Sequence, residues 1–296
     1  MVAKLYRNLI PASIRQTIYD NFLGSILYHL RHFRVHLKSK FTFLFSCFLP
    51  KTEENVALAF IGRHGITSYP YPYSLDYKNL KTNVLTDNTE GLSYVMHNGK
   101  KLYFPNAFTR EKIETLYSEL ITEQDSRSAH RYVVSYNELT GKTLLDIGSA
   151  EGMFSLDTIE FVDHVYLFEY ESFWQAALKA TFAPWSNKVT IIENYVGDKT
   201  QGIFITIDDF LKDKQRDNLF IKMDIEGAEQ SALNGALKTL KDGKNIHVAV
   251  CTYHKPEDPE KISALLGSLG YSYTFTPGLL YWGKRLSKAL IRGKKS

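Results

Sequence analysis

The clearest candidate for ligand chemistry in the sequence is a glycine-containing turn within residues 144–154, Leu-Leu-Asp-Ile-Gly-Ser-Ala-Glu-Gly-Met-Phe. An apolar run leads into this turn and a helical pattern follows it. Gly148 allows a ligand to approach the backbone closely, and Gly152 allows the helix to begin near the strand. A carboxylate, Glu169, ends the next apolar run, 21 residues after Gly148. This spacing suits a side chain that binds both hydroxyls of a ribose, so the unit predicts a nucleotide-containing cofactor.

The acids of the turn favour one class of cofactor over another. A dinucleotide site prefers G-x-G-x-x-G, in which a pyrophosphate rests on the helix N-terminus. This turn lacks the middle glycine and carries Asp146 and Glu151. Two carboxylates repel a pyrophosphate but attract a sulfonium and an α-amino group. We therefore expect S-adenosylmethionine rather than NAD.

A second block, Ile-Lys-Met-Asp-Ile-Glu-Gly-Ala-Glu at residues 221–229, places three acids and a lysine at the end of another apolar run. Together with the glycine turn, Phe168-Glu169 and Thr206-Ile207-Asp208-Asp209, it resembles the FkbM-type methyltransferase family. In that family the fourth strand ends in I-K-x-D-x-E-G-x-E and follows a T-x-D-D-like segment. The resemblance covers roughly residues 132–271. Two departures stand out: Ala150 replaces the usual Asn, and Tyr170 replaces the Pro that usually follows the ribose-binding Glu.

The resemblance implies a class I methyltransferase fold and O-methylation of a hydroxyl, commonly on a sugar or a secondary metabolite. It also gives the candidate cofactor-binding residues their roles. These are Asp146, Gly148, Ser149 and Gly152 at the methionine part, Glu169 at the ribose, Asn194, Tyr195 and Asp198 near the adenine, and Asp224 at either the acceptor or the amino group of the cofactor. A core position for Tyr195 and a turn cap for Asp198 are the structural alternatives.

Asp224, His254 and Glu226 are the candidate catalytic residues. Methyl transfer from a sulfonium is an in-line displacement, so the acceptor oxygen must lie about 3 Å from the methyl carbon. A hydroxyl acceptor must also lose its proton to a nearby base. His254 is partly neutral near pH 7 and is suited to that role, although a loop histidine that binds backbone or water fits the sequence equally well. Lys222 is expected to form an ion pair with Glu226 or Glu229.

A divalent metal is the alternative mechanism. Asp224, Glu226 and His254 are ligands of the kind that bind Mg, Mn or Zn. Such an ion would lower the pKa of the hydroxyl and reduce the need for a base. We expect no metal, because acids at this position serve equally well to surround a cationic sulfonium; turnover after exhaustive chelation distinguishes the two.

The elements that must position these residues follow an alternating pattern from Thr143 onward. Short apolar strands and helices alternate as far as residue 269, which predicts an α/β class with a doubly wound, mostly parallel sheet. This agrees with the class I methyltransferase Rossmann-like fold that the resemblance implies. The expected strands are 143–147, 165–169, 189–193, 219–224 and 246–252, and the expected helices are 152–161, 173–182, 228–241 and 258–269. Residues 271–276 and 279–282 are expected to form an antiparallel pair at the edge of the sheet.

Charge divides the rest of the chain. Residues 1–51 hold eight Lys or Arg against one acid, and residues 284–296 hold six Lys or Arg and no acid, while the net charge of the whole chain is only +4. We therefore expect four regions: a basic amphipathic helical extension (1–51), an accessory region with a β-hairpin at Asn98-Gly99 that could cap the acceptor (52–130), the catalytic domain (131–283) and a basic tail (284–296). In the extension, Ile14, Ile18, Phe22, Ile26 and Leu30 recur at helical spacing. Such a helix either lies on an anionic lipid surface or docks on the protein or on a second copy.

Composition narrows the expected cellular location and partners of the protein. Two cysteines cannot form a disulfide framework, which fits a cytoplasmic protein. The apolar run Phe41–Pro50 is half of the roughly 20 residues that a spanning helix requires, so contact with a membrane would be peripheral, at its inner surface. No nucleic-acid-binding motif accompanies the basic ends, and no nucleic-acid partner is expected.

The sequence thus predicts an S-adenosylmethionine-dependent O-methyltransferase that acts on a sugar, glycan or glycolipid precursor. The alternatives are methylation of a non-sugar small-molecule hydroxyl and a non-catalytic cofactor-binding scaffold. A homo-oligomer is compatible with the sequence.

Overall fold

The computed structural model describes residues 24–295. Its α-helices are α3 (Gly24–Leu44), α4 (Glu53–His64), α5 (Arg110–Glu123), α6 (Met153–Thr158), α7 (Ser172–Phe182), α8 (Ile207–Phe210), α9 (Glu229–Asn234), α10 (Leu237–Asp242) and α11 (Asp258–Ser268). Its strands are β1 (Leu85–Asp87), β2 (Leu92–His97), β3 (Lys100–Phe104), β4 (Thr143–Ile147), β5 (His164–Phe168), β6 (Val189–Ile192), β7 (Tyr195–Val196), β8 (Phe204–Ile205), β9 (Leu219–Met223), β10 (Ile246–Cys251), β11 (Ser272–Phe275), β12 (Leu280–Trp282), β13 (Arg285–Ser287) and β14 (Leu290–Lys295).

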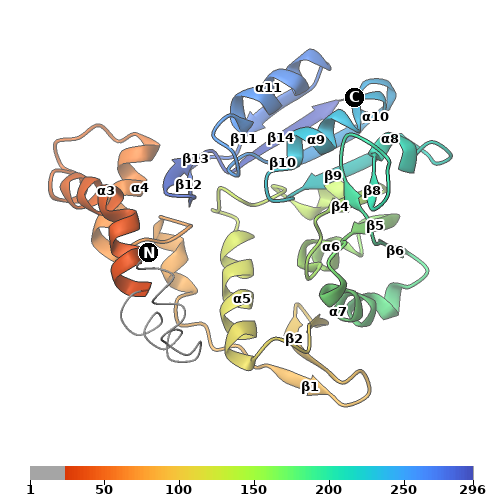
Figure 1. Cartoon of the computed structure of the whole chain (residues 1–296), viewed down its shortest axis with the longest axis horizontal. Coiled ribbons are helices and arrows are strands. Elements are labelled where there is room, and N and C mark those ends of the chain that lie inside the picture. Colours follow the sequence, from red (N-terminus) through yellow and green to blue (C-terminus); the bar gives the residue numbers. More distant parts are fainter. Residues whose placement is uncertain (1–23, 296) are drawn as a thin grey trace, which may run out of the picture.

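The centre of the molecule is a seven-stranded sheet in the order β11-β14-β10-β9-β4-β5-β6 (Figure 1). Strands β4, β5, β6, β9 and β10 pair in parallel, and β14 is antiparallel to both of its neighbours. Every residue of β9 is buried, as a strand covered on both faces requires. The class I methyltransferase fold is confirmed.

Helices cover both faces of this sheet, and alternate residues of each strand face opposite cores. Leu144 packs with residues of α6 and α7, whereas its neighbour Leu145 packs with residues of α8, α9, α10 and α11. The period-two geometry of a strand produces this division.

The C-terminal strands differ from the expectation. Residues 272–275 and 280–282 do not pair with each other: β11 pairs with β14, and β12 forms a separate hairpin with β13. The expected basic tail is therefore wrong as a separate region, because residues 290–295 are a strand of the central sheet. Its charges have partners within the fold, since Lys288 pairs with Glu53 and Lys294 pairs with Glu138.

The single helix expected over 228–241 is two helices, α9 and α10. They separate at Gly235, where an added Cβ would lie 2.0 Å from the carbonyl oxygen of Gly197. Asp208 then caps the N-terminus of α10, because its carboxylate accepts hydrogen bonds from the backbone N–H groups of Lys238 and Thr239. The T-x-D-D-like segment thus has a structural role in this chain.

The accessory region is not a separate domain. Its hairpin, β2–β3, turns at Asn98 and Gly99, which both have positive φ as expected. However, Phe104 and Ile113 belong to the same hydrophobic core as Leu144 of β4 and Leu156 of α6. The expected boundary near residue 130 therefore does not divide two cores.

Helices α3 and α4 form a lobe beside the sheet domain (Figure 1). The lobe is fastened to the β12–β13 region, because Glu53 accepts hydrogen bonds from Gly278 N and Lys288 Nζ. The predicted amphipathic positions Ile14, Ile18 and Phe22 lie outside the described residues. Among the described helices, none has the length and apolar character needed to cross a bilayer.

Candidate active site

A cavity of about 1190 Å³ lies beyond the carboxyl ends of β4 and β9. This is the position where doubly wound sheets bind ligands. The residues that line it come from the glycine turn, the end of β9, α5, residues 66–69, the segments that follow α5 and β10, and the β12–β13 hairpin. They include Gly148, Ser149, Ala150, Glu151, Lys222, Asp224, Glu226, Tyr132, Tyr253, Tyr69, Glu119, Glu123, Tyr281 and Trp282.

The glycine turn is held against the end of β9. Gly148 has a φ of +75°, and an added Cβ would lie 2.1 Å from the carbonyl oxygen of Asp224. Gly152 has a φ of +79° and closely approaches Phe182 of α7. Both glycines are therefore required by close contacts. Ala150 also has a positive φ, +45°, a conformation that Asn adopts more readily than Ala, which explains why the family usually has Asn there.

Asp146 does not face the cavity in the way the sequence suggested. It is buried, pairs with Lys222 at 2.8 Å, and accepts a hydrogen bond from Ser155 at 2.6 Å. Lys222 also donates to the carbonyl oxygen of Gly148 at 2.6 Å. The expected pairing of Lys222 with Glu226 or Glu229 is wrong. Lys222 instead neutralises Asp146 and holds the turn in place.

Two other residues of the turn fit a bound amino acid moiety. Glu151 lines the cavity and is buried, and this burial raises its pKa to about 7. The hydroxyl of Ser149 is buried at the same wall and has no hydrogen-bond partner among the described residues. A buried acid without an opposite charge in contact and an unpaired hydroxyl suit the ammonium and carboxylate of a methionine group.

The remaining predicted cofactor residues lie beside the ends of β5 and β6. Glu169 accepts hydrogen bonds from the backbone N–H groups of Ala150 and Glu171, which places its carboxylate next to the turn. Tyr195 packs on Tyr170 at 4.3 Å between ring centres and donates to Glu171.

The loop after β6 gives two of its predicted residues structural contacts. Asn194 donates from its side chain to Ile203 O, and the Asp198 backbone N–H donates to Ser231. Neither residue lines the cavity, so their role at an adenine ring stays a prediction.

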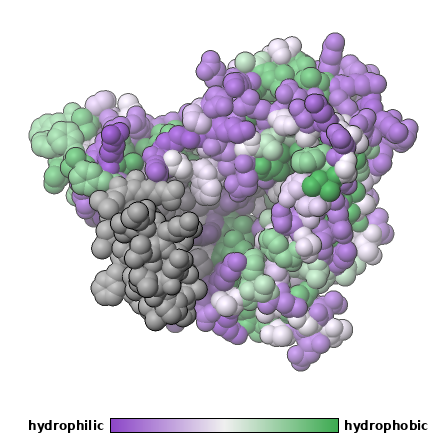
Figure 2. Space-filling model, in the orientation of Figure 1, coloured by the Kyte–Doolittle hydropathy of each residue, from purple (hydrophilic) through white to green (hydrophobic). Residues whose placement is uncertain are grey.

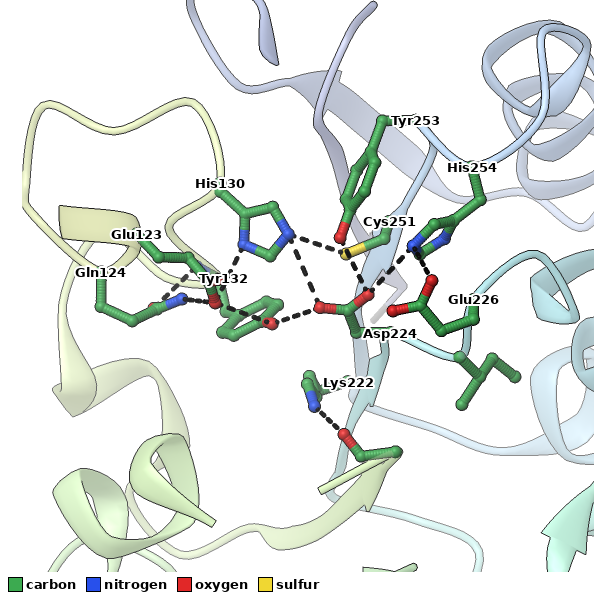
Figure 3. Close-up of polar contacts among 12 residues, drawn as sticks. Glu123, Gln124, His130, Tyr132, Lys222, Asp224, Glu226, Cys251, Tyr253 and His254 are labelled. Atoms are coloured by element: carbon green, nitrogen blue, oxygen red, sulfur yellow. Dashed lines mark hydrogen bonds and ion pairs between the residues drawn. The ribbon is translucent and has the colours of Figure 1, made fainter. Parts of the chain in front are cut away.

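Asp224 is the centre of the polar network at the cavity wall (Figure 3). Its carboxylate accepts a hydrogen bond from Tyr132 at 2.8 Å and lies 3.3 Å from the hydroxyl of Tyr253. Imidazoles flank it on both sides, His130 at 3.6 Å and His254 at 3.7 Å. Burial alone would raise the pKa of Asp224, but His130, Lys222 and His254 lower it below its usual value. Asp224 is therefore an ionised group that faces the cavity.

His254 lies behind Asp224 and does not line the cavity. Its Nδ1 is 2.8 Å from the fully buried carboxylate of Glu229, and its Nε2 is 3.6 Å from Glu226. Burial lowers the pKa of His254, but Glu229, Asp224 and Glu226 together raise it above its usual value. Glu226 extends into the opening of the cavity from a backbone with a φ of +53°. Asp224, rather than His254, therefore faces the cavity.

On the other side, His130 connects α5 with the end of β9. It is buried between Glu123, 3.2 Å away, and Asp224. Burial lowers the pKa of His130, but the two carboxylates raise it above its usual value. Sequence reasoning did not find Glu123, His130 or Tyr132, because they precede the first strand of the sheet and carry no motif. Glu229 belonged to the acidic block, but only the fold pairs it with His254.

Two groups of side chains in the described part of the chain offer metal-ligand geometry. They are His130 with Asp224 and Cys251, and Asp224 with Glu229 and His254. In both groups the imidazole already has a carboxylate partner, which accounts for the arrangement without an ion.

Comparison with known proteins identifies the class. A family model described as the methyltransferase FkbM domain matches residues 67–273, which is more than half of the chain. The chain therefore belongs to the FkbM methyltransferase family. It is a methyltransferase, and its methyl donor is S-adenosylmethionine.

Solved structures that match parts of the chain include methyltransferases. Precorrin-6y C5,15-methyltransferase from Geobacter metallireducens shares 12% identity over 57% of this chain and 89% of its own, with a TM-score of 0.39. Magnesium protoporphyrin IX methyltransferase from Synechocystis, with bound SAM, shares 14% identity over 63% of this chain and 79% of its own, with a TM-score of 0.35. A search of curated proteins found no match.

Proposed function

We propose that this methyltransferase transfers the methyl group to a hydroxyl oxygen of a saccharide or of a saccharide-containing precursor. The observation that carries this proposal is the position of Asp224. It is ionised, it faces the cavity, and it lies directly against Gly148 of the turn that binds the donor. A hydroxyl held by Asp224 would therefore lie close to the methyl group.

The donor residues have separate tasks. Glu151 and Ser149 would bind the ammonium and carboxylate of the donor, and Glu169 would bind its ribose. When bound, S-adenosylmethionine supplies an electrophilic methyl whose carbon–sulfur bond breaks with its electron pair going to sulfur, while the acceptor oxygen forms the new carbon–oxygen bond.

Asp224 would accept the hydroxyl proton. As the carbon–oxygen bond forms, that proton becomes strongly acidic, so even a carboxylate with a lowered pKa is a sufficient base. His254 and His130 hold Asp224 in position and keep it ionised until the acceptor arrives. His254 is thus a positioning residue, fixed in turn by Glu229.

The wall opposite the turn suits a sugar ring. Trp282 is partly exposed at the cavity and packs edge-on against Tyr253 at 5.7 Å. Tyr69 also lines the cavity and donates to Glu123. Aromatic faces pack on the C–H face of a sugar, and the carboxylates of Glu119 and Glu123 can accept hydrogen bonds from its hydroxyls. Tyr71 and Tyr73, in the same tyrosine-rich loop, do not line the cavity.

Variants of the two halves of the site test this proposal. We expect Glu169→Ala to raise the Kd for S-adenosylmethionine about tenfold, because it removes the contact with the ribose. We expect Asp224→Asn to lower kcat about 100-fold with saccharide acceptors. His254→Ala should also slow turnover while the Kd for the donor stays nearly unchanged. Glu257→Gln, a carboxyl-to-amide change on the exposed start of α11, is the matched control and should keep full activity.

The acceptor is identified by labelled methyl transfer into a panel of oligosaccharides, lipid-linked saccharides and non-sugar alcohols. Label in the saccharides supports the proposal. Label only in the non-sugar alcohols contradicts the saccharide assignment, and donor binding without transfer to any hydroxyl supports a scaffold. Equal loss of donor affinity in the Glu169 and His254 variants would refute the division of roles.

A further inference from the structure

Over residues 32–44, helix α3 has most of its large apolar side chains on the outside. Phe33, Leu37, Phe41 and Leu44 recur along one face and are all exposed, and Phe45 and Phe48 extend the face beyond the helix. Leu44 is 70% exposed and Phe48 is 86% exposed. We call these six residues the α3 apolar face. Pale green, apolar residues are visible at the outer end of the α3–α4 lobe in Figure 2.

The opposite side of α3 is polar and buried. Ser39 and Thr42 are buried against α4, where an added Cβ at Gly62 would lie 2.2 Å from the carbonyl oxygen of Ser39. A helix that packs on a soluble protein normally buries its apolar stripe and exposes its polar one. In the described side chains of α3 this order is largely reversed: Phe43 approaches Gly62 of α4, but the six residues of the α3 apolar face remain exposed. A contiguous exposed apolar face of this kind marks an interaction surface.

The charges around the α3 apolar face indicate the chemistry of the partner. Residues 24–51 contain five Lys or Arg and no Asp or Glu. Arg34, Lys40 and Lys51 are exposed, and helical spacing places Arg34 and Lys40 next to apolar residues of the face. Lys38 pairs with Glu54 of α4. Phenylalanine and leucine bordered by basic residues match the boundary between acyl chains and anionic head groups.

A second copy of the chain fits this surface poorly. In a two-fold dimer the same patch meets itself, so the exposed basic residues of one copy would face those of the other. Residues 24–51 contain no acid to compensate, and Glu54 of α4 is already paired with Lys38. We propose that the α3 apolar face binds the surface of an anionic lipid bilayer. This orientation would bring the lobe to the membrane. The cavity, which His32 of α3 and residues 66–69 after α4 help to line, would then lie near the head groups.

Vesicle flotation of the full chain tests the proposal. We expect binding to phosphatidylcholine vesicles that contain phosphatidylglycerol, weaker binding to phosphatidylcholine alone, and loss of binding at high salt. The triple variant Phe41→Ser, Phe45→Ser, Phe48→Ser should bind at least about tenfold more weakly, because less apolar surface enters the bilayer. The matched control changes three exposed apolar residues elsewhere, Met96→Ser, Val134→Ser and Leu237→Ser, and should bind like the original protein.

A second measurement uses a single aromatic replacement that keeps the α3 apolar face, so that it does not depend on whether the triple variant folds. Adding anionic vesicles should shift the fluorescence emission of Phe48→Trp to the blue by more than it shifts that of the original protein. Brominated acyl chains in the vesicles should quench this emission. Failure to bind anionic vesicles, or equal binding by the triple variant, overturns the proposal. Sedimentation that reveals a dimer, dissociated by the triple substitution and without vesicle binding, overturns it in favour of a second copy. None of these outcomes depends on the acceptor or on catalysis.

Discussion

The carboxylates around the donor-binding turn are of two electrostatic kinds. Asp146 is neutralised by Lys222, whereas Glu151 is buried without an opposite charge in contact, and its pKa is raised to about 7. A sequence shows only that both residues are acids. Their depth and neighbours decide that Glu151, and not Asp146, is the one available to a cationic ligand.

Glu151 makes donor binding dependent on pH. A bound ammonium or sulfonium favours the ionised carboxylate, so binding lowers the pKa of Glu151 and releases a proton wherever Glu151 was protonated beforehand. We therefore expect the affinity for S-adenosylmethionine to rise as the pH increases toward 7, by up to about tenfold per pH unit, and to level off above it.

Calorimetry at pH 6.5 in buffers of different ionisation enthalpy measures the proton released. Glu151→Gln should bind more weakly and release less than the original protein. An unchanged proton count in that variant would show that Glu151 is not the group that titrates.

At the scale of elements, the C-terminal residues contribute to the fold mainly as a strand of the sheet, and less through their basic charge. Strand β14 lies between β10 and β11 and pairs with both, and Leu290 and Ile291 are fully buried. The residues that looked like a basic tail thus complete the sheet beside the site.

We expect a chain that ends at Lys288 to lose cooperative unfolding, because β10 and β11 would both lose a pairing partner. The control is Lys294→Gln, which removes only the ion pair with Glu138 and should cost about 1 kcal/mol or less. Soluble expression and thermal unfolding followed by circular dichroism measure both. A shortened chain that unfolds as sharply as the full one would contradict this role of β14.

At the scale of the whole molecule, His130 joins the accessory region to the sheet. Its contacts with Glu123 of α5 and Asp224 after β9 close one side of the cavity. The folded pKa of His130 is raised, so its stabilising contribution is fully present below the ordinary histidine pKa of about 6.5 and is lost as the pH rises through the folded value.

We expect the free energy of unfolding to fall as the pH rises above about 6.5, with His254 contributing in the same direction. His130→Asn should lower stability by about 2 kcal/mol at pH 6, because it leaves the half-buried carboxylate of Glu123 without its cation and removes one of the three cations beside Asp224, and should flatten the pH dependence. Urea unfolding across this pH range measures both effects. His64→Asn, on the exposed surface of α4, is the control. The assignment would be contradicted if the free energy of unfolding of the His130 variant changed with pH as steeply as that of the original protein.

The sequence by itself determined the family, the alternating strands and helices, and the positions of Gly148, Glu169 and Asp224 at the strand ends. These features depend on local periodicity and on the positions of glycines and acids after apolar runs. A sequence displays both directly. It also predicted the hairpin at Asn98-Gly99, since that turn requires positive φ at both positions.

Only the tertiary structure decided which charges meet. Lys222 pairs with Asp146 of a neighbouring strand, Glu229 with His254, and His130 with Asp224, and each of these pairs joins elements that are distant in the sequence. It also decided that the basic C-terminal residues form a strand and that α3 exposes its apolar face. Ion pairs, buried pKa shifts and exposed surfaces depend on distances between elements, and a linear pattern does not contain those distances.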